Sequence, residues 1–280
     1  MGDYSLSDVE FNVLRDLVYA RTGIRFDEQK RTYVEKRVSD RMRRCGDTSG
    51  QRYISWLKTD GNHGELQALI NTLTVNETYF FREDYQFRCL TSSLLPEITA
   101  TSRRKSLRIW SLPCSTGDEP YSIAIRLLES FDGVDDYDIE IMGSDLDTAV
   151  LASCEEARYS QRSLQHVPAN LLQRYFEPLS DGKWRVCEGL RDSVTFTQCS
   201  LVDRTQMLRH GRFDVVFCRN VLIYFDAVSR RLAADNIYEV LHPGGFICLG
   251  HSESMSRISA SFDVRKFQEA IVYQRPNRDG

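Results

Sequence analysis

A short loop with two acidic residues lies between the first strand that the sequence predicts, at 107–112, and the helix predicted to follow it. Asp118 and Glu119 precede Pro120 in this loop, and a proline suits the first turn of a helix because its missing N–H is no loss there. Loops of this kind are where open α/β sheets bind ligands. Because two carboxylates would repel a pyrophosphate, the loop disfavours NAD and favours a cationic ligand such as S-adenosylmethionine. An ordinary connecting loop is the alternative.

A second acidic position follows the strand predicted around 139–142. Asp145 lies just past this strand, where a carboxylate can accept hydrogen bonds from both ribose hydroxyls of a bound nucleoside. Asp147 lies where the next helix would begin, so we expect it to cap that helix. Enzymes that bind dinucleotides and enzymes that bind S-adenosylmethionine both use such an acid. Together with the acidic first loop, Asp145 favours the methyl donor.

Two polar residues, Arg219 and Asn220, interrupt a long apolar run that begins with the strand predicted at 213–218. Leaving each such group buried without a partner would cost about 1–3 kcal/mol, and more for a charge. We therefore expect both side chains at the carboxyl end of the strand, facing a cleft. A surface-exposed turn is the alternative.

One fixed positive charge, Arg82, follows the aromatic cluster 79–81 at the junction between the two parts of the chain. Clefts between domains are favoured ligand sites, so Arg82 is a candidate for binding an anionic group. A lone aromatic cluster is more often part of the hydrophobic core than of a site, and the core is the alternative for residues 79–81. The sequence contains no visible Ser/His/Asp or Cys/His arrangement for nucleophilic catalysis.

The elements that must position these residues begin with a helical region that covers about the first hundred residues. Ser7 and Glu10 form a capping box at its start. Gly23 and Gly46 stop the first two predicted helices, the second of which spans about 27–44. Further along, short apolar runs alternate with amphipathic stretches, which predicts helices crossing over a parallel sheet.

The alternation breaks at 158–200. This segment contains predicted strands at 184–187 and 194–197, and we interpret it as a small antiparallel insertion. The sequence therefore predicts an N-terminal helical domain with its linker at 1–88, and an α/β domain at 89–280 that carries the insertion.

Composition excludes several classes of protein. The chain has 280 residues, with 36 Lys and Arg against 40 Asp and Glu and a net charge of −4, which argues against a protein that coats nucleic acid. Its eight cysteines include no C-x-x-C pair, so we expect buried thiols and no metal site.

The first residues do not look like a signal peptide, and no apolar run approaches the ~18 residues of a membrane span. We expect a soluble, cytoplasmic, monomeric protein.

Five segments carry these motifs along the chain, at 76–82, 110–122, 144–147, 213–226 and 241–253. In this order they resemble the CheR family of chemoreceptor glutamate methyltransferases, over nearly the whole chain. The resemblance implies an N-terminal helical domain on a Rossmann-like methyltransferase domain with a small inserted β-subdomain. It also implies transfer of the methyl group of S-adenosylmethionine to glutamates of transmembrane chemoreceptors, which gives methyl esters and S-adenosylhomocysteine.

The resemblance further implies which residues contact the cofactor: Asn76, Thr78, Arg82, Glu119, Asp145, Ser200, Leu201, Arg219, Asn220 and Val221. The pair Ser200–Leu201 falls where the family has Asn-Leu, so a backbone contact would survive but a side-chain amide contact would not. Asp118 stands where Glu is usual and keeps the charge, so we expect no loss of binding there.

A glutamate acceptor needs little activation. Its carboxyl group has a reference pKa of about 4.3 and is ionised at neutral pH, so no general base is required. The enzyme has to align donor and acceptor and to exclude water. Arg82 is the candidate for orienting the carboxylate, and Tyr224 is the candidate for lining the channel of methyl transfer.

Four cations on the second predicted helix are candidates for a partner surface. Lys30, Arg37, Arg41 and Arg44 are spaced by seven, four and three residues and share one helical face. A solvated face is the plain alternative. The resemblance favours docking onto the acidic, glutamate-bearing helices of a receptor's cytoplasmic domain, with an affinity that salt weakens. The hairpin around 180–183 looks compact, which favours a form that does not use it to bind a receptor's C-terminal peptide.

Two other functions stay open. One is a related methyltransferase whose acceptor is another protein carboxylate or a small acid, and the basic helix counts against the small acid. The other is a non-catalytic module that binds S-adenosylhomocysteine or a receptor. A dehydrogenase is disfavoured because the glycine-rich loop is missing.

Overall fold

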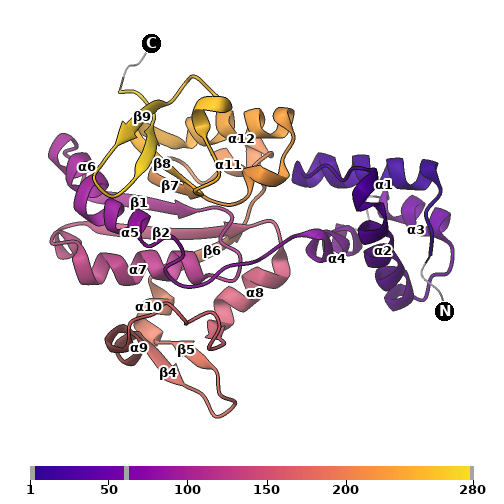
Figure 1. The fold of residues 1–280 in the computed structure, drawn as a ribbon, viewed down its shortest axis with the longest axis horizontal. Coiled ribbons are helices and arrows are strands. Elements are labelled where there is room, and N and C mark those ends of the chain that lie inside the picture. Colours follow the sequence, from indigo (N-terminus) through magenta and orange to yellow (C-terminus); the bar gives the residue numbers. More distant parts are fainter. Residues whose placement is uncertain (1–3, 60–62, 278–280) are drawn as a thin grey trace.

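The computed structural model describes residues 4–59 and 63–277, which form a helical domain and a larger sheet domain (Figure 1). The helical domain consists of helices α1 (Asp8–Thr22), α2 (Arg31–Cys45), α3 (Gly50–Leu57) and α4 (His63–Leu73), with a 3-10 turn, η1 (Glu28–Lys30), before α2. Apolar side chains from all of these helices form one core, so the predicted helical region is present as a domain with its own hydrophobic interior.

The ends of the first helices follow from the sequence. The capping box predicted at the start of α1 is present, with Ser7 and Glu10 bonded reciprocally. Gly23 ends α1 with a φ of 72°, in the left-handed region that favours glycine. It also permits a close approach of the sheet domain, because a Cβ here would lie 2.6 Å from Val202. The second helix begins later than predicted, since the residues up to Lys30 form η1.

The sheet domain is built on a seven-stranded sheet with the order β6-β2-β1-β7-β8-β10-β9. The first five strands in this order, β6, β2, β1, β7 and β8, run parallel to one another. The last two, β10 and β9, pair antiparallel at one edge of the sheet. The predicted strands are all present, and the sheet comprises β1 (Ser106–Ser111), β2 (Asp138–Asp145), β6 (Val194–Gln198), β7 (Phe213–Cys218), β8 (Leu241–Leu249), β9 (Asp263–Lys266) and β10 (Ile271–Gln274).

Helices cover both faces of this sheet (Figure 1). One face packs against α7 (Asp118–Ser130) and the helical segment formed by α5 (Tyr85–Cys89), the π-helical turn η3 (Leu90–Leu94) and α6 (Leu95–Thr101). The other packs against α11 (Arg204–Leu208) and α12 (Ala227–Val240). α8 (Thr148–Glu156) contacts both β6 and α4. The remaining short turns are η4 (Val134–Asp136), η5 (Leu222–Tyr224) and η6 (Met255–Arg257).

A small antiparallel sheet in the order β3-β5-β4 projects from the sheet domain (Figure 1). It consists of β3 (Arg158–Tyr159), β4 (Phe176–Pro178) and β5 (Trp184–Val186), with α9 (Ala169–Tyr175) and α10 (Glu188–Asp192) beside it. The strand predicted at 194–197 does not belong to this insertion, because β6 pairs in parallel with β2. The sequence reveals that this segment is a strand but not which strand it pairs with, since the partner lies about fifty residues away.

The junction between the two domains packs with the sheet. Phe80, Phe81 and Phe87 are buried in the same core cluster as residues of β1 and β7, so most of the aromatic cluster belongs to the core. The domain boundary between residues 88 and 89 stays a prediction. In the ranges that the structure describes, no helix combines the length and the apolar character that crossing a membrane would require.

Candidate functional site

A cavity of about 460 Å³ lies between the two domains, where the carboxyl ends of β1, β2 and β7 meet. All the residues that the resemblance assigned to the cofactor line it: Asn76, Thr78, Arg82, Glu119, Asp145, Ser200, Leu201, Arg219, Asn220 and Val221. Tyr224 and Lys30 line it as well. The helical domain closes one side through Ile24 and Phe26. The parallel topology explains this convergence, because the strand ends fall at one edge of the sheet.

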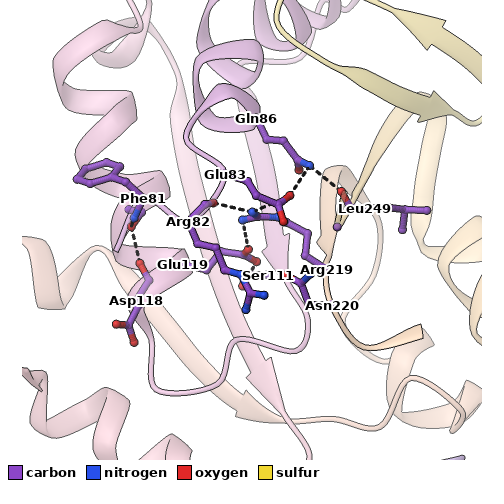
Figure 2. A network of polar contacts seen from close by, with 12 residues as sticks. Phe81, Arg82, Glu83, Gln86, Ser111, Asp118, Glu119, Arg219, Asn220 and Leu249 are labelled. Atoms are coloured by element: carbon purple, nitrogen blue, oxygen red, sulfur yellow. Dashed lines mark hydrogen bonds and ion pairs between the residues drawn. The ribbon is translucent and has the colours of Figure 1, made fainter. Parts of the chain in front are cut away.

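A buried ion cluster forms the floor of the cavity (Figure 2). Glu119 accepts a hydrogen bond from the Ser111 hydroxyl at 2.7 Å and pairs with Arg219 at 2.6 Å. Arg219 also pairs with Glu83 at 3.2 Å and donates to the Arg82 carbonyl at 2.6 Å. Burial opposes the charge of Arg219, but the two carboxylates raise its pKa. Arg219 is therefore held as a cation that fixes the Glu119 carboxylate at the cavity surface.

Asp145 is the second acid at the cavity. Its carboxylate accepts hydrogen bonds from the backbone N–H groups of Ser115 and Asp147, both at 2.9 Å, and burial raises the pKa of Asp145 to about 6. Asp147 caps α8, as predicted, by accepting from the Ala149 N–H at 2.8 Å. Its second oxygen accepts from the side-chain amide of Asn76 at 2.8 Å, which ties the interdomain segment to the loop after β2.

Asp118 differs from the expectation that both acids of the first loop face the ligand. Its side chain is fully buried and is not part of the cavity lining. It accepts a hydrogen bond from the Thr116 hydroxyl at 2.7 Å, and burial raises its pKa to about 6. Asp118 is held by Thr116 in the loop before the helix, so of the two acids only Glu119 lines the cavity. The carboxylates that favour a cationic ligand in the cavity are therefore those of Glu119 and Asp145.

The mouth of the cavity is formed by more exposed groups. Tyr224 is 42% exposed and the neighbouring Ile223 is 44% exposed. Arg82 donates to the Glu77 carbonyl at 2.8 Å and lies over the ring of Tyr79. An arginine held in this way keeps donors available for an anion that enters from solvent.

Ser200 is the position where the chain departs from the family pattern. Its hydroxyl donates to the Arg21 carbonyl at 3.0 Å, and its backbone N–H donates to Gln206. The side chain is therefore engaged with the end of α1. This contact joins the sheet domain to the helical domain beside the cavity.

The four cations predicted for docking have different environments. Lys30 is exposed at the cavity edge and Arg44 is exposed near the end of α2, whereas Arg37 stacks on Tyr33. Arg41 departs from the expectation of a solvated docking group, because its Nε pairs with Glu65 at 3.0 Å and its side chain is only 15% exposed. The helical spacing could not reveal this pair, since Glu65 comes from α4.

Sequence reasoning missed two carboxylates that support the site. Glu83 pairs with Arg219, and its only signal is its place directly after Arg82. Glu253 binds the backbone after β7. It lies within a motif on which the resemblance rested, but three of its four backbone partners are about thirty residues away, and no local pattern identifies these three.

Comparison with known proteins gives the same assignment. The family model "CheR methyltransferase, all-alpha domain" matches residues 9–74, and "CheR methyltransferase, SAM binding domain" matches residues 76–271. The chain belongs to the CheR family. It is 43% identical over 278 residues to "Chemotaxis protein methyltransferase 2" of Vibrio cholerae, with 99% of this chain and 96% of that protein covered. It is 36% identical over 266 residues to "Chemotaxis protein methyltransferase" of Escherichia coli, with 93% and 90% covered.

Membership of the CheR family confirms the predicted fold, a helical domain followed by a methyltransferase domain that binds S-adenosylmethionine. The cavity suits such a ligand, because Glu119 and Asp145 place two carboxylates on its surface. Among the described residues, no three His, Cys, Asp or Glu side chains gather as they would around a metal ion.

Proposed function

We propose that this CheR protein transfers the methyl group of S-adenosylmethionine to glutamate side chains in the cytoplasmic domain of chemoreceptors, giving methyl esters. The single observation that carries the proposal is the cavity itself, where the carboxylates of Asp145, which is buried, and Glu119, which is 12% exposed, face a mouth that contains an arginine. The names of the relatives, chemotaxis protein methyltransferases, support the pathway.

Three groups of the cavity would hold the donor. Asp145 would accept hydrogen bonds from the ribose hydroxyls, as acids at this position do. Glu119 would attract the positively charged end of the donor, and Arg219 keeps the Glu119 carboxylate in place. The remaining cofactor residues would form the wall around the nucleoside: Asn76, Thr78, Ser200, Leu201, Asn220 and Val221.

The acceptor carboxylate would enter from the mouth. S-adenosylmethionine supplies an activated methyl group, and an ionised glutamate needs no base to attack it. Arg82 would orient the carboxylate through charge-assisted hydrogen bonds, and Tyr224 would line the path between acceptor and donor. Aligning two reactants in this way supplies about 7–11 kcal/mol of barrier reduction when the geometry is right.

The receptor would dock on the exposed cations of the helical domain. Lys30 and Arg44 are exposed and available for an acidic partner, and Arg37 is half-buried beside Tyr33. Arg41 is no longer part of this proposal because of its pair with Glu65. A cytoplasmic location, a monomeric state and the absence of metal and nucleic-acid binding stay predictions.

The test is transfer of a labelled methyl group from S-adenosylmethionine to a panel of receptor cytoplasmic fragments, made with and without their C-terminal peptides. Label that alkali releases as methanol identifies a carboxyl ester. Equal labelling of the two fragment forms agrees with the prediction that no peptide tether is used. Donor binding without any transfer would favour another acceptor or a non-catalytic module.

A further inference from the structure

One carboxylate behind the cavity surface holds two backbone segments together. Glu253 Oε2 accepts hydrogen bonds from the N–H groups of Asn220 and Gly250, both at 2.8 Å. Glu253 Oε1 accepts from the N–H groups of Val221 at 3.0 Å and Leu222 at 2.7 Å. All four donors are main-chain groups, and three of them belong to the segment that follows β7. Glu253 itself does not line the cavity.

The segment after β7 needs such support. Asn220 has a φ of 58°, in the left-handed region that residues with a Cβ rarely occupy. Consecutive N–H groups that converge on one carboxylate stabilise this conformation, because no helix or strand partner satisfies them. Gly250 permits the arrangement, since a Cβ there would lie 2.6 Å from the Asn220 amide and 2.9 Å from Glu253 Oε2.

We propose that Glu253 is a positioning residue for donor binding and methyl transfer. Its carboxylate sets the backbone of residues 220–222, and this backbone places Asn220 and Val221 in the cavity wall and Tyr224 at the mouth. The inference rests on the proposed function of the cavity, but the backbone arrangement can be tested without any ligand.

The first test is amide hydrogen exchange of the wild-type protein without ligand. The N–H groups of Asn220, Val221 and Gly250 should exchange slowly, like those of neighbouring strands, because each donates to Glu253. In Glu253→Gln one acceptor oxygen becomes an amide group that cannot accept, so two of the four N–H groups bonded to Glu253 lose their partner: either Asn220 and Gly250 or Val221 and Leu222. Their exchange should accelerate while exchange in β1 and β7 is unchanged. Unprotected exchange in the wild-type protein would overturn the inference, whether or not the variant folds.

The second test is binding of S-adenosylhomocysteine by calorimetry, well below the melting temperature of each variant. Glu253→Gln should raise the Kd at least about tenfold and lower kcat. The matched control is Glu97→Gln, since Glu97 binds Arg265 through two hydrogen bonds far from the cavity. The control should leave the Kd within about twofold of wild type.

The possible outcomes distinguish a failure of the role proposed for Glu253 from a failure of the function proposed for the cavity. A merely structural role would lower the melting temperature of Glu253→Gln and leave the Kd unchanged, which overturns the inference. Failure of the wild-type protein to bind S-adenosylhomocysteine would contradict the proposed function, and the exchange rates would still decide whether Glu253 sets the backbone.

Discussion

The charged side chains on the sheet side of the cavity are at most 12% exposed and have several partners each, whereas the side chains on the solvent side are more exposed and have fewer partners. We call Glu119, Asp145 and Arg219 the cofactor wall, and Arg82, Ile223 and Tyr224 the acceptor rim. Arg219 is 5% exposed and Tyr224 is 42% exposed. A wall fixed by buried ion pairs suits a small ligand of constant shape. An open rim suits a side chain that a second protein presents.

The largest effect should come from Arg219→Met, which removes the buried cation between Glu119 and Glu83. The two carboxylates would be left buried without compensation, so the free energy of unfolding should fall by about 3–5 kcal/mol in urea titrations. The control Arg174→Met removes an exposed arginine that pairs with Glu129 and should cost no more than about 1 kcal/mol. Similar losses in both variants would break the contrast between buried wall and exposed surface.

On the acceptor rim, Arg82→Ala should lower kcat for methyl transfer by about 100-fold or more, because the carboxylate loses its orienting partner. Steady-state kinetics with a receptor fragment measures this. Arg82→Lys keeps the positive charge but lacks the planar guanidinium group that can donate two parallel hydrogen bonds to a carboxylate. This variant should therefore recover only part of the activity. Near-normal turnover in Arg82→Ala would remove this residue from the mechanism.

The cofactor wall also predicts a pH dependence. Burial raises the pKa of Asp145 to about 6, and the ionised form is the one that accepts hydrogen bonds from ribose hydroxyls. Affinity for S-adenosylhomocysteine should therefore be full above about pH 6 and should fall as the pH drops through that value, by up to about tenfold per pH unit. Calorimetry across this range measures the profile.

Two variants sharpen this prediction. Asp145→Asn should bind weakly at every pH and lose the dependence. Asp118→Asn should retain it, because Asp118 has a similarly raised pKa but does not line the cavity. A flat wild-type profile, or one that Asp118→Asn abolishes, would contradict the assignment of Asp145 to the ribose.

The smallest effect should come from the exposed end of α2. Arg44→Glu should raise the KM for a receptor fragment by about two- to tenfold at low salt, and the difference should shrink at high salt because exposed charges are screened. The control Arg103→Glu makes the same charge change at an exposed arginine before β1, and should not alter the KM. Equal effects at the two positions would point to net charge instead of a docking surface.

Much of the fold could be predicted because its signals are local. The capping box at Ser7, the glycine that ends α1 and the apolar strands each depend on neighbouring residues. The cofactor residues could be grouped because consecutive parallel strands place their carboxyl ends at one edge of the sheet. Asp145 and Asp147 could even be given separate roles, since only one of them lies where a helix begins.

What could not be predicted depends on contacts between distant segments. The prediction that the strand at 194–197 belongs to the insertion is wrong, because its pairing partner is β2, far away in the sequence. Arg41 is a docking candidate by its helical spacing alone, which cannot reveal its partner because Glu65 lies on another helix. Glu83 and Glu253 carry no local pattern, and their roles appear only when β7, β8 and the interdomain segment are brought together.

The division between wall and rim is tested most directly by measuring two quantities in two variants, Glu119→Gln and Arg82→Ala. The quantities are the Kd for S-adenosylhomocysteine by calorimetry and kcat for a receptor fragment at saturating donor. Glu119→Gln should raise the Kd by about tenfold or more and change kcat less. Arg82→Ala should lower kcat far more than it weakens binding. If both variants change the Kd and kcat by the same factors, the cavity has no such division and the account is wrong.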